Sequence, residues 1–332
     1  MRIAVLGAGA WGTALAIRLC TRHAPCRVVL WGRDAAHLDE LAAERTNRRY
    51  LPDHPFPDSL RLTSALDAAV EHADLVVIAV PVAGLRGTLH AVAAGGRKPP
   101  LIWACKGFEM ESARLPHQVV REAYPATPAC GVLSGPSFAQ EVASGLPTAM
   151  TLASFDEGFS QNIAAQLHGA RLRVYSSRDV VGVETGGAVK NVISIAAGIS
   201  DGMGFGHNAR AALITRGLAE ITRLGLRLGG SMETFLGLAG AGDLILTCTG
   251  DLSRNRQVGL ALAAGRPLPD ILRELGHIAE GVYTARAVAR LSRELDVDMP
   301  ITRAVSGVLH DGVPARLAVE ALLSREPKRE AC

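Results

Sequence analysis

A glycine-rich segment near the N-terminus constrains the fold more than any other feature of the sequence. The segment GAGAWG follows a short apolar run, Ile3–Leu6, and leads into an apolar helical stretch, Thr13–Leu19. In such a turn the first glycine permits a tight bend, the second lets a pyrophosphate approach the backbone, and the third lets helix and strand pack closely. Because the segment lies between a strand and a helix, it predicts a dinucleotide-binding βαβ unit. The three glycines are Gly7, Gly9 and Gly12.

Short apolar runs alternate with helical stretches through the first half of the chain. The runs that predict further buried strands are Val28–Trp31, Leu75–Val80, Leu101–Ala104 and Val132–Leu133, with Thr148–Ala153 and Leu172–Tyr175 as additional strands at the far side. Continuous apolar strands separated by helices are typical of a parallel sheet that helices cover on both faces. We therefore expect a Rossmann-type, doubly wound α/β domain that binds NAD(P) over residues 1–178.

Helical periodicity dominates the second half. The stretches that suit helices are Arg210–Leu226, Leu268–Leu275, Tyr283–Leu295 and Ile301–Leu309. Only Leu244–Cys248 suggests a strand. We expect an all-helical domain over residues 179–332.

The composition excludes several classes of protein. The 332 residues include 35 Lys+Arg and 32 Asp+Glu, a net charge of +3 that argues against a nucleic-acid binder. Neither the six cysteines nor the ten histidines have zinc-ligand spacing, so we expect no metal site. The N-terminus leads directly into a strand rather than a signal peptide, and no apolar run reaches the ~18–20 residues of a membrane span. We therefore expect a cytoplasmic protein without a membrane span.

The residues after the second predicted strand bear on the choice of cofactor. An NAD-selective site places Asp or Glu about 20 residues beyond the glycine loop, where it binds the ribose 2′-hydroxyl. Here Gly32 stands near that position and Arg33 follows it. Arginine pairs with a 2′-phosphate, so Arg33 favours NADP(H) unless it is an ordinary solvated loop charge. The neighbouring Asp34 keeps NAD(H) open.

Lysines that could transfer a proton are few, because only four of the 35 basic residues are lysines. Lys98 is predicted to lie in a surface loop, and Lys328 lies in the charged tail. Lys106 follows the strand Leu101–Ala104, at the sheet edge where such domains bind ligands. Lys190 lies on a helical face of small residues, a setting in which a lysine can shift its pKa and act in acid–base catalysis. The alternative is a lysine that reaches solvent from a helix end.

Two further segments carry candidate polar groups. Ser134–Ala139 follows a short strand and offers a hydroxyl and free amides. In the helical half, Gly240–Asp243 supplies a carboxylate that could pair with a lysine, and Ser253–Arg256 supplies groups that could hold a phosphate. A plain turn and a helix cap with solvated charges are the alternative interpretations.

Taken together, the motifs resemble those of bacterial-type NAD(P)-dependent glycerol-3-phosphate dehydrogenases. The matching segments, in the family's order, are GAGAWGTALA at 7–16, LWGRD at 30–34, CKGFE at 105–109, SGPSFAQEVASGLPTA at 134–149, GGAVKNV at 186–192, GAGDLILTCTGDLSRNR at 240–256, AEG at 279–281 and MPIT at 299–302. The chain departs from the family at Cys105 and Phe108, where Thr and Leu are usual. Both neighbour Lys106, so the departures concern fine geometry.

The resemblance implies an activity and a set of site residues. The family reduces dihydroxyacetone phosphate to sn-glycerol 3-phosphate for phospholipid synthesis, and its members commonly form homodimers. Lys190 would be the proton donor and acceptor. The residues that would contact the substrate are Lys106, Gly135, Ser137, Lys190, Asp243, Ser253, Arg254 and Asn255. Those that would border the cofactor are Gly7, Gly9, Ala10, Trp11, Gly12, Arg33, Lys106, Ala139, Arg254, Ile278 and Glu280.

Two other functions are compatible with parts of the pattern. Two-domain reductases of the β-hydroxyacid or ketopantoate type share the glycine loop and a lysine in the helical domain. They lack the Ser253–Asn255 segment in combination with Gly135–Ser137. A cofactor-binding sensor without turnover would need neither Lys106 nor Lys190.

Overall fold

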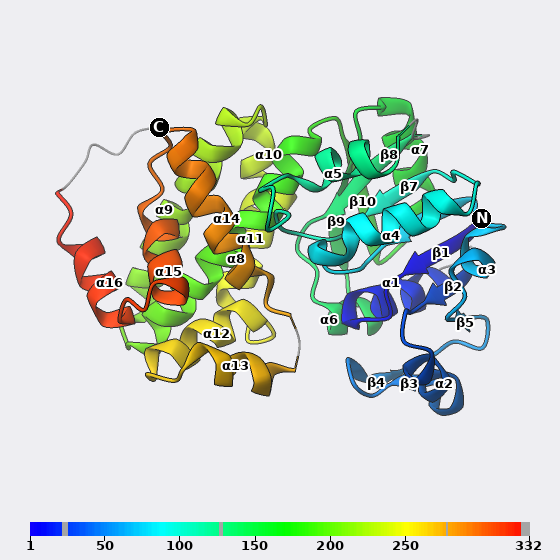
Figure 1. The fold of residues 1–332 in the computed structure, drawn as a ribbon, viewed down its shortest axis with the longest axis horizontal. Helices are drawn as coiled ribbons and strands as arrows, with labels where there is room; N and C mark the ends of the chain where they lie inside the picture. Colours follow the sequence, from blue (N-terminus) through cyan, green and yellow to red (C-terminus); the bar gives the residue numbers. More distant parts are fainter. Residues whose placement is uncertain (22–25, 126–128, 277, 327–332) are drawn as a thin grey trace.

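The protein folds into two lobes, a sheet lobe and a helical lobe (Figure 1). The computed structural model describes residues 1–21, 26–125, 129–276 and 278–326. Lys328, which the sequence places in a charged tail, lies outside the described residues. The expected combination of a Rossmann-type sheet domain followed by a helical domain is confirmed.

The sheet has eight strands in the order β10-β9-β8-β7-β6-β1-β2-β5. Their bounds are β1 Arg2–Leu6, β2 Arg27–Trp31, β5 Arg61–Thr63, β6 Leu75–Ile78, β7 Leu101–Trp103, β8 Cys130–Ser134, β9 Thr148–Ala153 and β10 Leu172–Ser177. All strands that the sequence predicts in this domain are present. One pairing differs from a purely parallel sheet, because β9 runs antiparallel to β8 while β10 runs parallel to β9. The sequence did not predict β5, nor the small hairpin of β3 (Thr46–Asn47) and β4 (Leu51–Pro55).

Helices cover both faces of the sheet, as continuous apolar strands require. They are α1 Ala10–Cys20, α2 Ala35–Glu44, α3 Leu66–Val70, α4 Val82–Ala94, α5 Pro116–Ala123, α6 Ala139–Ala143 and α7 Glu157–Leu167. Alternate residues of β1 enter two separate cores: Ile3 and Val5 pack with α1 and α7, whereas Ala4 and Leu6 pack with α4 and α5. The carboxyl ends of the parallel strands are therefore left free for a ligand.

The helical lobe is built around α8 (Val180–Gly202), which is buried along most of its length. The surrounding elements are α9 Gly206–Arg227, α10 Met232–Leu236, the π-helical turn Leu238–Gly242, α11 Asp243–Thr249, α12 Arg254–Ala263, α13 Leu268–Leu275, α14 Glu280–Glu294, α15 Pro300–His310 and α16 Ala315–Leu323. Within the described residues, α8 is the one helix long and apolar enough to cross a membrane. Because 94% of its most apolar stretch is buried inside the protein, it serves as a core helix.

The strand suggested for Leu244–Cys248 is wrong, since this segment forms most of α11. Leu244 and Cys248 are buried whereas Ile245 is 51% exposed, so burial follows the period of a helix and not that of a strand. Side-chain hydroxyls reinforce the helix: Thr247 Oγ1 donates to the Asp243 carbonyl four residues earlier. A short apolar run alone does not separate the two structures.

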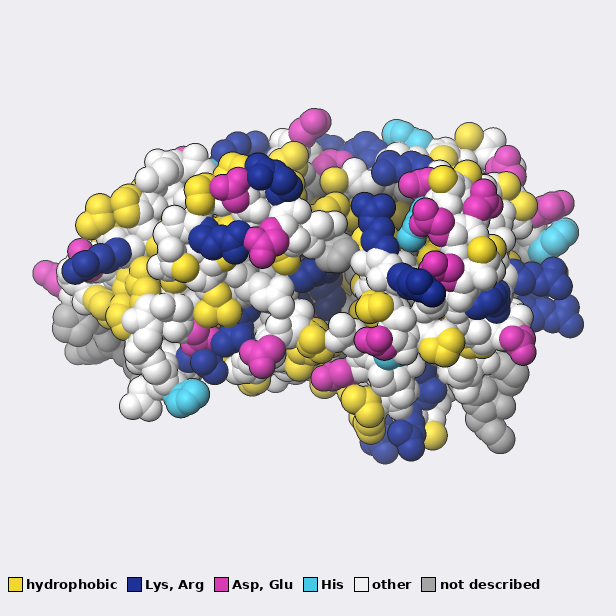
Figure 2. All heavy atoms as spheres, turned by 90° about the horizontal axis from the view of Figure 1, so that it is seen from below, with side chains coloured by type: hydrophobic (Ala, Val, Ile, Leu, Met, Phe, Trp, Pro, Cys, Tyr) yellow, Lys and Arg dark blue, Asp and Glu magenta, His cyan; other side chains and the backbone are white. Residues whose placement is uncertain are grey.

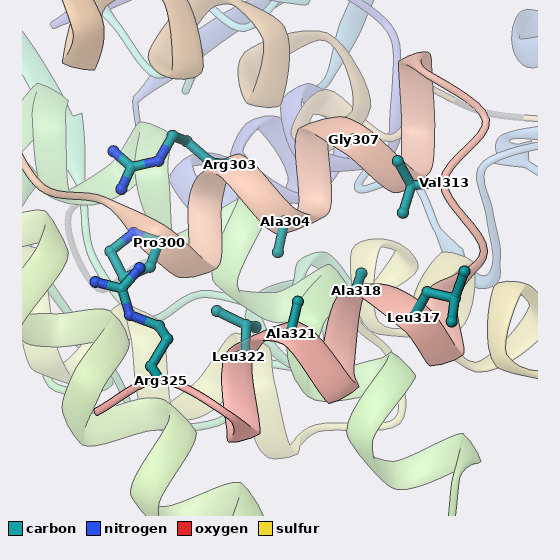
Figure 3. A pocket seen from close by; sticks show the side chains of 10 residues that line it. All are labelled: Pro300, Arg303, Ala304, Gly307, Val313, Leu317, Ala318, Ala321, Leu322 and Arg325. Atoms are coloured by element: carbon teal, nitrogen blue, oxygen red, sulfur yellow. The ribbon is translucent and has the colours of Figure 1, made fainter. Parts of the chain in front are cut away.

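Glycines let α12 cross α8 with the two backbones in contact. A Cβ at Gly198 would lie 2.1 Å from the Arg256 carbonyl oxygen, and one at Gly259 would lie 2.1 Å from the Ile195 carbonyl oxygen. This crossing brings the N-terminal end of α12 to the middle of α8. At the far end of the lobe, α16 lies along α15, with a groove of about 280 Å³ between them (Figure 3).

Candidate active site

The geometry of the glycine loop separates the roles of its three glycines. Gly7 has φ +127°, and a Cβ there would lie 2.8 Å from the carbonyl group of Ala79. A Cβ at Gly12 would lie 1.9 Å from the Gly7 carbonyl oxygen. At Gly9, by contrast, no atom of the described residues comes within 4 Å of the position that a Cβ would take. The protein itself thus requires the first and third glycines, and the open space at the second fits the approach of a dinucleotide pyrophosphate.

Asn47 holds this loop in place. Its side chain is fully buried, and its Nδ2 donates to the Ala8 carbonyl oxygen at 3.0 Å and to Thr13 Oγ1 at 2.9 Å. Asn47 ends β3, in the hairpin that sequence reasoning missed. A polar residue in an irregular stretch carries no periodic signal, so its partner could be found only from the structure.

A side chain at the position expected for a ribose-binding acid would require the neighbouring Leu38 side chain to shift. A Cβ at Gly32 would lie 2.3 Å from Leu38 Cδ2. Asp34 is engaged as the N-cap of α2, where its Oδ1 accepts a hydrogen bond from the His37 amide at 3.2 Å. Arg33 is exposed. Arg33 and Asp34 both face solvent beyond the end of β2, and Asp34 is the one whose carboxylate caps a helix.

We predict that Gly9→Ala separates cofactor binding from stability. Gly9 has φ −81° and ψ −177°, which alanine adopts without strain, so the unfolding temperature is expected to stay close to that of the parent. The methyl group would occupy the space left for a pyrophosphate, so the dissociation constant of NADPH is expected to rise roughly tenfold or more. Fluorescence titration measures this dissociation constant. Gly87→Ala, at an open position inside α4, is the control. It should leave the dissociation constant of NADPH unchanged and raise the unfolding temperature slightly, because alanine favours a helix interior.

A buried carboxylate joins the two candidate lysines. Lys106 follows β7, Lys190 lies on α8, and Asp243 begins α11. Lys106 Nζ lies 2.6 Å from Asp243 Oδ2, and Lys190 Nζ donates to Asp243 Oδ1. Asp243 is only 1% exposed. The sequence predicted that Asp243 could pair with a lysine, and the structure shows it paired with both.

The surroundings of Lys190 prepare it to exchange a proton. Its Nζ also donates to Thr247 Oγ1 at 2.8 Å, a partner that sequence reasoning missed. Burial lowers the pKa of Lys190 to about 8, aided by the like charge of Lys106 and opposed by Asp243. An ammonium group with this pKa can release its proton near neutral pH, as a general acid requires.

The segment after β8 reaches the same cluster. Gly135 has φ +133°, and a Cβ there would lie 3.1 Å from Met150 Cα on β9. Its carbonyl oxygen accepts hydrogen bonds from Lys106 Nζ at 3.1 Å and from Ser137 Oγ at 3.0 Å. Because β1, β7 and β8 are parallel, their carboxyl ends bring the glycine loop, Lys106 and Gly135 to one edge of the sheet.

The N-terminal end of α12 lies against α8, close to the lysine cluster. Ser253 Oγ caps α12 and lies 3.0 Å from Ser194 Oγ, which donates to the Thr247 carbonyl oxygen. Asn255 is held from two sides: its Nδ2 donates to Asn191 Oδ1 and its Oδ1 accepts from the Gly281 amide, both at 3.0 Å. Asn255 therefore connects α8, α12 and α14.

The charges of Arg254 and Glu280 interact, and Glu280 lies where the two lobes meet. Arg254 is exposed, and the Glu280 carboxylate attracts it. Glu280 also accepts a hydrogen bond from the Val82 amide at the start of α4, and burial raises the pKa of Glu280 to about 7. Figure 2 shows a hollow between the lobes with basic side chains deep inside it.

The remaining predicted cofactor residues stand at the surface of the same two lobes. Ala10, Trp11 and Ala139 are half-buried, and Ile278 is exposed. Among the described residues, no side-chain hydrogen bond or ion pair joins these four to the lysine cluster. The part of the chain that the structure describes contains no group of three or more His, Cys, Asp or Glu side chains arranged for a metal ion.

Comparisons with known proteins point in one direction. Two family models match: the NAD-dependent glycerol-3-phosphate dehydrogenase N-terminus over residues 2–160 and its C-terminus over residues 179–320. The chain is 70% identical to a glycerol-3-phosphate dehydrogenase [NAD(P)+] of Nitrosospira multiformis and 64% identical to one of Nitrosomonas europaea, each over 99% of both chains.

Solved structures give the same result. A glycerol-3-phosphate dehydrogenase from Coxiella burnetii is 43% identical, with a TM-score of 0.93 over 98% of this chain and 99% of that one. A D-mandelate dehydrogenase is 13% identical over 96% of this chain and 99% of that one, with a TM-score of 0.59, and thus shares the fold alone.

Proposed function

Because this chain belongs to the NAD-dependent glycerol-3-phosphate dehydrogenase family, we propose that it reduces dihydroxyacetone phosphate to sn-glycerol 3-phosphate with NAD(P)H. The observation that carries the assignment of roles is the bridge Lys106–Asp243–Lys190 at the carboxyl edge of the sheet. Reductases of the β-hydroxyacid or ketopantoate type and a sensor without turnover are not favoured, since the full-length relatives are glycerol-3-phosphate dehydrogenases.

Lys190 is the proposed catalytic acid. A nicotinamide cofactor held against the glycine loop would supply the hydride that reduces the substrate's carbonyl carbon. As negative charge grows on the carbonyl oxygen, the Lys190 ammonium stabilises it and then transfers its proton to that oxygen. Asp243 fixes the direction of the Lys190 side chain, and Thr247 Oγ1 provides a second anchor at 2.8 Å. In the reverse direction, neutral Lys190 accepts the proton.

We propose that the phosphate group of the substrate fixes the orientation of the substrate in the site. Arg254 offers a guanidinium that pairs with a phosphate through two hydrogen bonds. Ser253, Asn255, Gly135 and Ser137 complete this pocket, while Lys106 contacts both substrate and cofactor. Binding energy from a phosphate that does not react can hold the ketone in place for the proton transfer.

The cofactor would lie against the glycine loop. The helix α1 begins at Ala10, so its free amides and the loop backbone can bind the pyrophosphate. The residues proposed to border the cofactor are Gly7, Gly9, Ala10, Trp11, Gly12, Arg33, Lys106, Ala139, Arg254, Ile278 and Glu280. Arg33 supports a preference for NADP(H), because an exposed guanidinium at the end of β2 pairs with a 2′-phosphate and a carboxylate would repel it.

We predict that Arg33→Ala alters the choice of cofactor. The dissociation constant for NADPH is expected to rise roughly 10- to 100-fold, the effect of losing a charge-assisted hydrogen bond, while that for NADH stays unchanged. Titration with each cofactor measures both constants. Arg178→Ala, an exposed arginine paired with Glu157, is the control. Equal losses for the two cofactors would contradict a role for Arg33 at the 2′-phosphate.

One assay tests the proposed activity. Absorbance at 340 nm is followed with dihydroxyacetone phosphate and either NADPH or NADH, in parallel with β-keto acids and ketopantoate. Rapid loss of absorbance with dihydroxyacetone phosphate alone is the expected result. Turnover of another ketone in its place would overturn the substrate assignment.

Assembly, location and domain division are part of the same proposal. We infer a cytoplasmic homodimer that supplies glycerol 3-phosphate for phospholipid synthesis, and an NAD(P)-binding domain over 1–178 followed by a substrate and dimerisation domain over 179–332. The domain division is supported by the end of β10 at Ser177 and the start of α8 at Val180. The dimer is supported by apolar side chains that the helical lobe exposes, such as Phe205, Leu226 and Leu236. Sedimentation velocity tests the dimer.

A further inference from the structure

A second buried carboxylate, Glu184, links the two lobes beside the lysine cluster. It lies in the first turns of α8 and is 4% exposed. Its Oε1 accepts hydrogen bonds from Trp103 Nε1 and from the His117 amide, both at 2.8 Å. Its Oε2 lies 2.5 Å from His117 Nδ1. Every partner of this carboxylate therefore belongs to the sheet lobe.

Glu184 joins the helix that carries Lys190 to the strand that precedes Lys106 and to the start of α5. Trp103 ends β7, three residues before Lys106, and His117 is the second residue of α5. Glu184 itself precedes Lys190 on α8 by less than two helical turns. A Cβ at Gly187 would lie 2.9 Å from Ser134 Oγ and 3.5 Å from Lys106 Cγ, so α8 passes very close to the Lys106 side chain here.

We propose that Glu184 is a positioning residue that sets the distance between Lys106 and Lys190 by fastening the end of β7 to α8. This inference rests on the roles proposed above for the two lysines. Burial raises the pKa of the Glu184 carboxyl, so keeping an acid here has a cost that a purely apolar contact would avoid. The directional hydrogen bonds of Glu184 allow only one alignment of the two lobes. Apolar packing alone has no such directionality and specifies the alignment less strictly.

Glu220 provides a matched control within the same chain. It is a glutamate of α9 that is 1% exposed, and burial raises its pKa as well. Its carboxylate accepts from the Ile301 amide at 2.6 Å, the Thr302 amide at 3.1 Å and Thr302 Oγ1 at 2.8 Å. Both glutamates thus cap the start of another helix, but Glu220 acts entirely inside the helical lobe.

The experiment compares Glu184→Leu with Glu220→Leu in the full-length enzyme. Both variants are expected to unfold at lower temperature. Only Glu184→Leu is expected to lower kcat/KM for dihydroxyacetone phosphate, by roughly 10- to 100-fold, because small displacements of reacting groups have effects of this size. Calorimetry should show a weaker affinity of the cofactor-free protein for sn-glycerol 3-phosphate. Glu184→Gln, which keeps an oxygen acceptor for Trp103, should recover part of both losses.

The pH profile gives a readout that a loss of stability would not change. The titratable groups that face Lys190 are Asp243 and Cys248 of α11 and Lys106 of the sheet lobe. Burial raises the pKa of Cys248 to about 12, so its thiol stays neutral and only Asp243 and Lys106 act on the charge of Lys190. If Lys106 moves away in Glu184→Leu, its lowering effect on the pKa of Lys190 weakens. The alkaline limb of the reduction profile is then expected to move to higher pH, whereas Glu220→Leu keeps the limb where it is.

Trp103→Phe covers the case in which Glu184→Leu does not fold. Phenylalanine keeps an aromatic ring but removes both the indole N–H and part of the buried ring volume. We expect a smaller loss of kcat/KM with a shift of the limb in the same direction. The inference is overturned if these variants lose stability alone, with kinetics, affinity and pH profile like those of Glu220→Leu. If instead Lys190→Met stays fully active, the proposed roles of the lysines fail, which is a separate outcome.

Discussion

Replacing Lys190 with methionine is expected to lower kcat for the reduction of dihydroxyacetone phosphate by roughly 10²- to 10⁴-fold, the range typical of a lost general acid. Methionine has similar length and an apolar chain, so it fills the buried space on α8. It offers neither the proton nor the positive charge that the developing alkoxide requires. Steady-state kinetics at saturating cofactor measure the effect.

The control for this substitution is Lys98→Met. Lys98 donates to the Pro125 carbonyl oxygen at the surface and takes no part in the site, so its kinetics should match those of the parent. If the Lys190→Met variant is folded by circular dichroism and retains near-normal kcat, Lys190 is not the catalytic acid.

The pH dependence of the parent follows from the same group. Reduction needs Lys190 with its proton, so kcat/KM for reduction is expected to fall as the pH rises through about 8. Oxidation of glycerol 3-phosphate needs the neutral amine and is expected to rise over the same range. In Lys190→Met both limbs should be absent from the residual activity.

Asp243→Asn is expected to have the second large effect. The amide keeps the shape but removes the charge that holds two ammonium groups, so kcat/KM should fall roughly 100-fold through misplacement of both lysines. Burial and Lys106 would still lower the pKa of Lys190, while the carboxylate that raises it is gone. The alkaline limb of the reduction profile should therefore move below pH 8, opposite to the direction expected for Glu184→Leu.

Asp201→Asn is the matched control for this change. Asp201 is also a buried carboxylate of the helical lobe that joins two cations, with Arg210 Nε at 2.7 Å and Arg256 Nε at 2.8 Å. Each variant is expected to lose about 3 kcal/mol of stability, since removing one partner leaves buried charge uncompensated. Only Asp243→Asn should shift the pH profile. Equal profiles in the two variants would show that Asp243 supports the fold but not the chemistry.

Local patterns predicted most of the sheet lobe. Strands such as Leu75–Ile78 are short apolar runs bounded by turns, and the glycine loop has a spacing that few other structures require. β5 was missed because it has three residues and only partial burial. Leu244–Cys248 was misassigned because an apolar run of five residues satisfies both helix and strand, and only its tertiary partners decide between them.

For the site, the sequence could predict residue types but not pairings. Lys106 and Asp243 are 137 residues apart, and nothing local indicates that one carboxylate lies between both lysines. The same limit explains why Asn47, Thr247 and Glu184 were missed. Each is a polar residue whose importance comes from a partner far along the chain, and such partners depend on how the two lobes meet.

The burial of α8 has a consequence for how an enzyme of this kind can change over evolutionary time. Glu184, Lys190 and Ser194 lie on a helix that is also the centre of a hydrophobic core. A helix advances a fixed 1.5 Å per residue, so the spacing of these groups cannot drift without unfolding the lobe. Substitutions that change the substrate preference would therefore have to occur in the surrounding segments, which are the π-helical turn, the start of α12 and the loop after β8. The groups on α8 therefore keep fixed relative positions, and changes in substrate preference fall on the segments that face this helix.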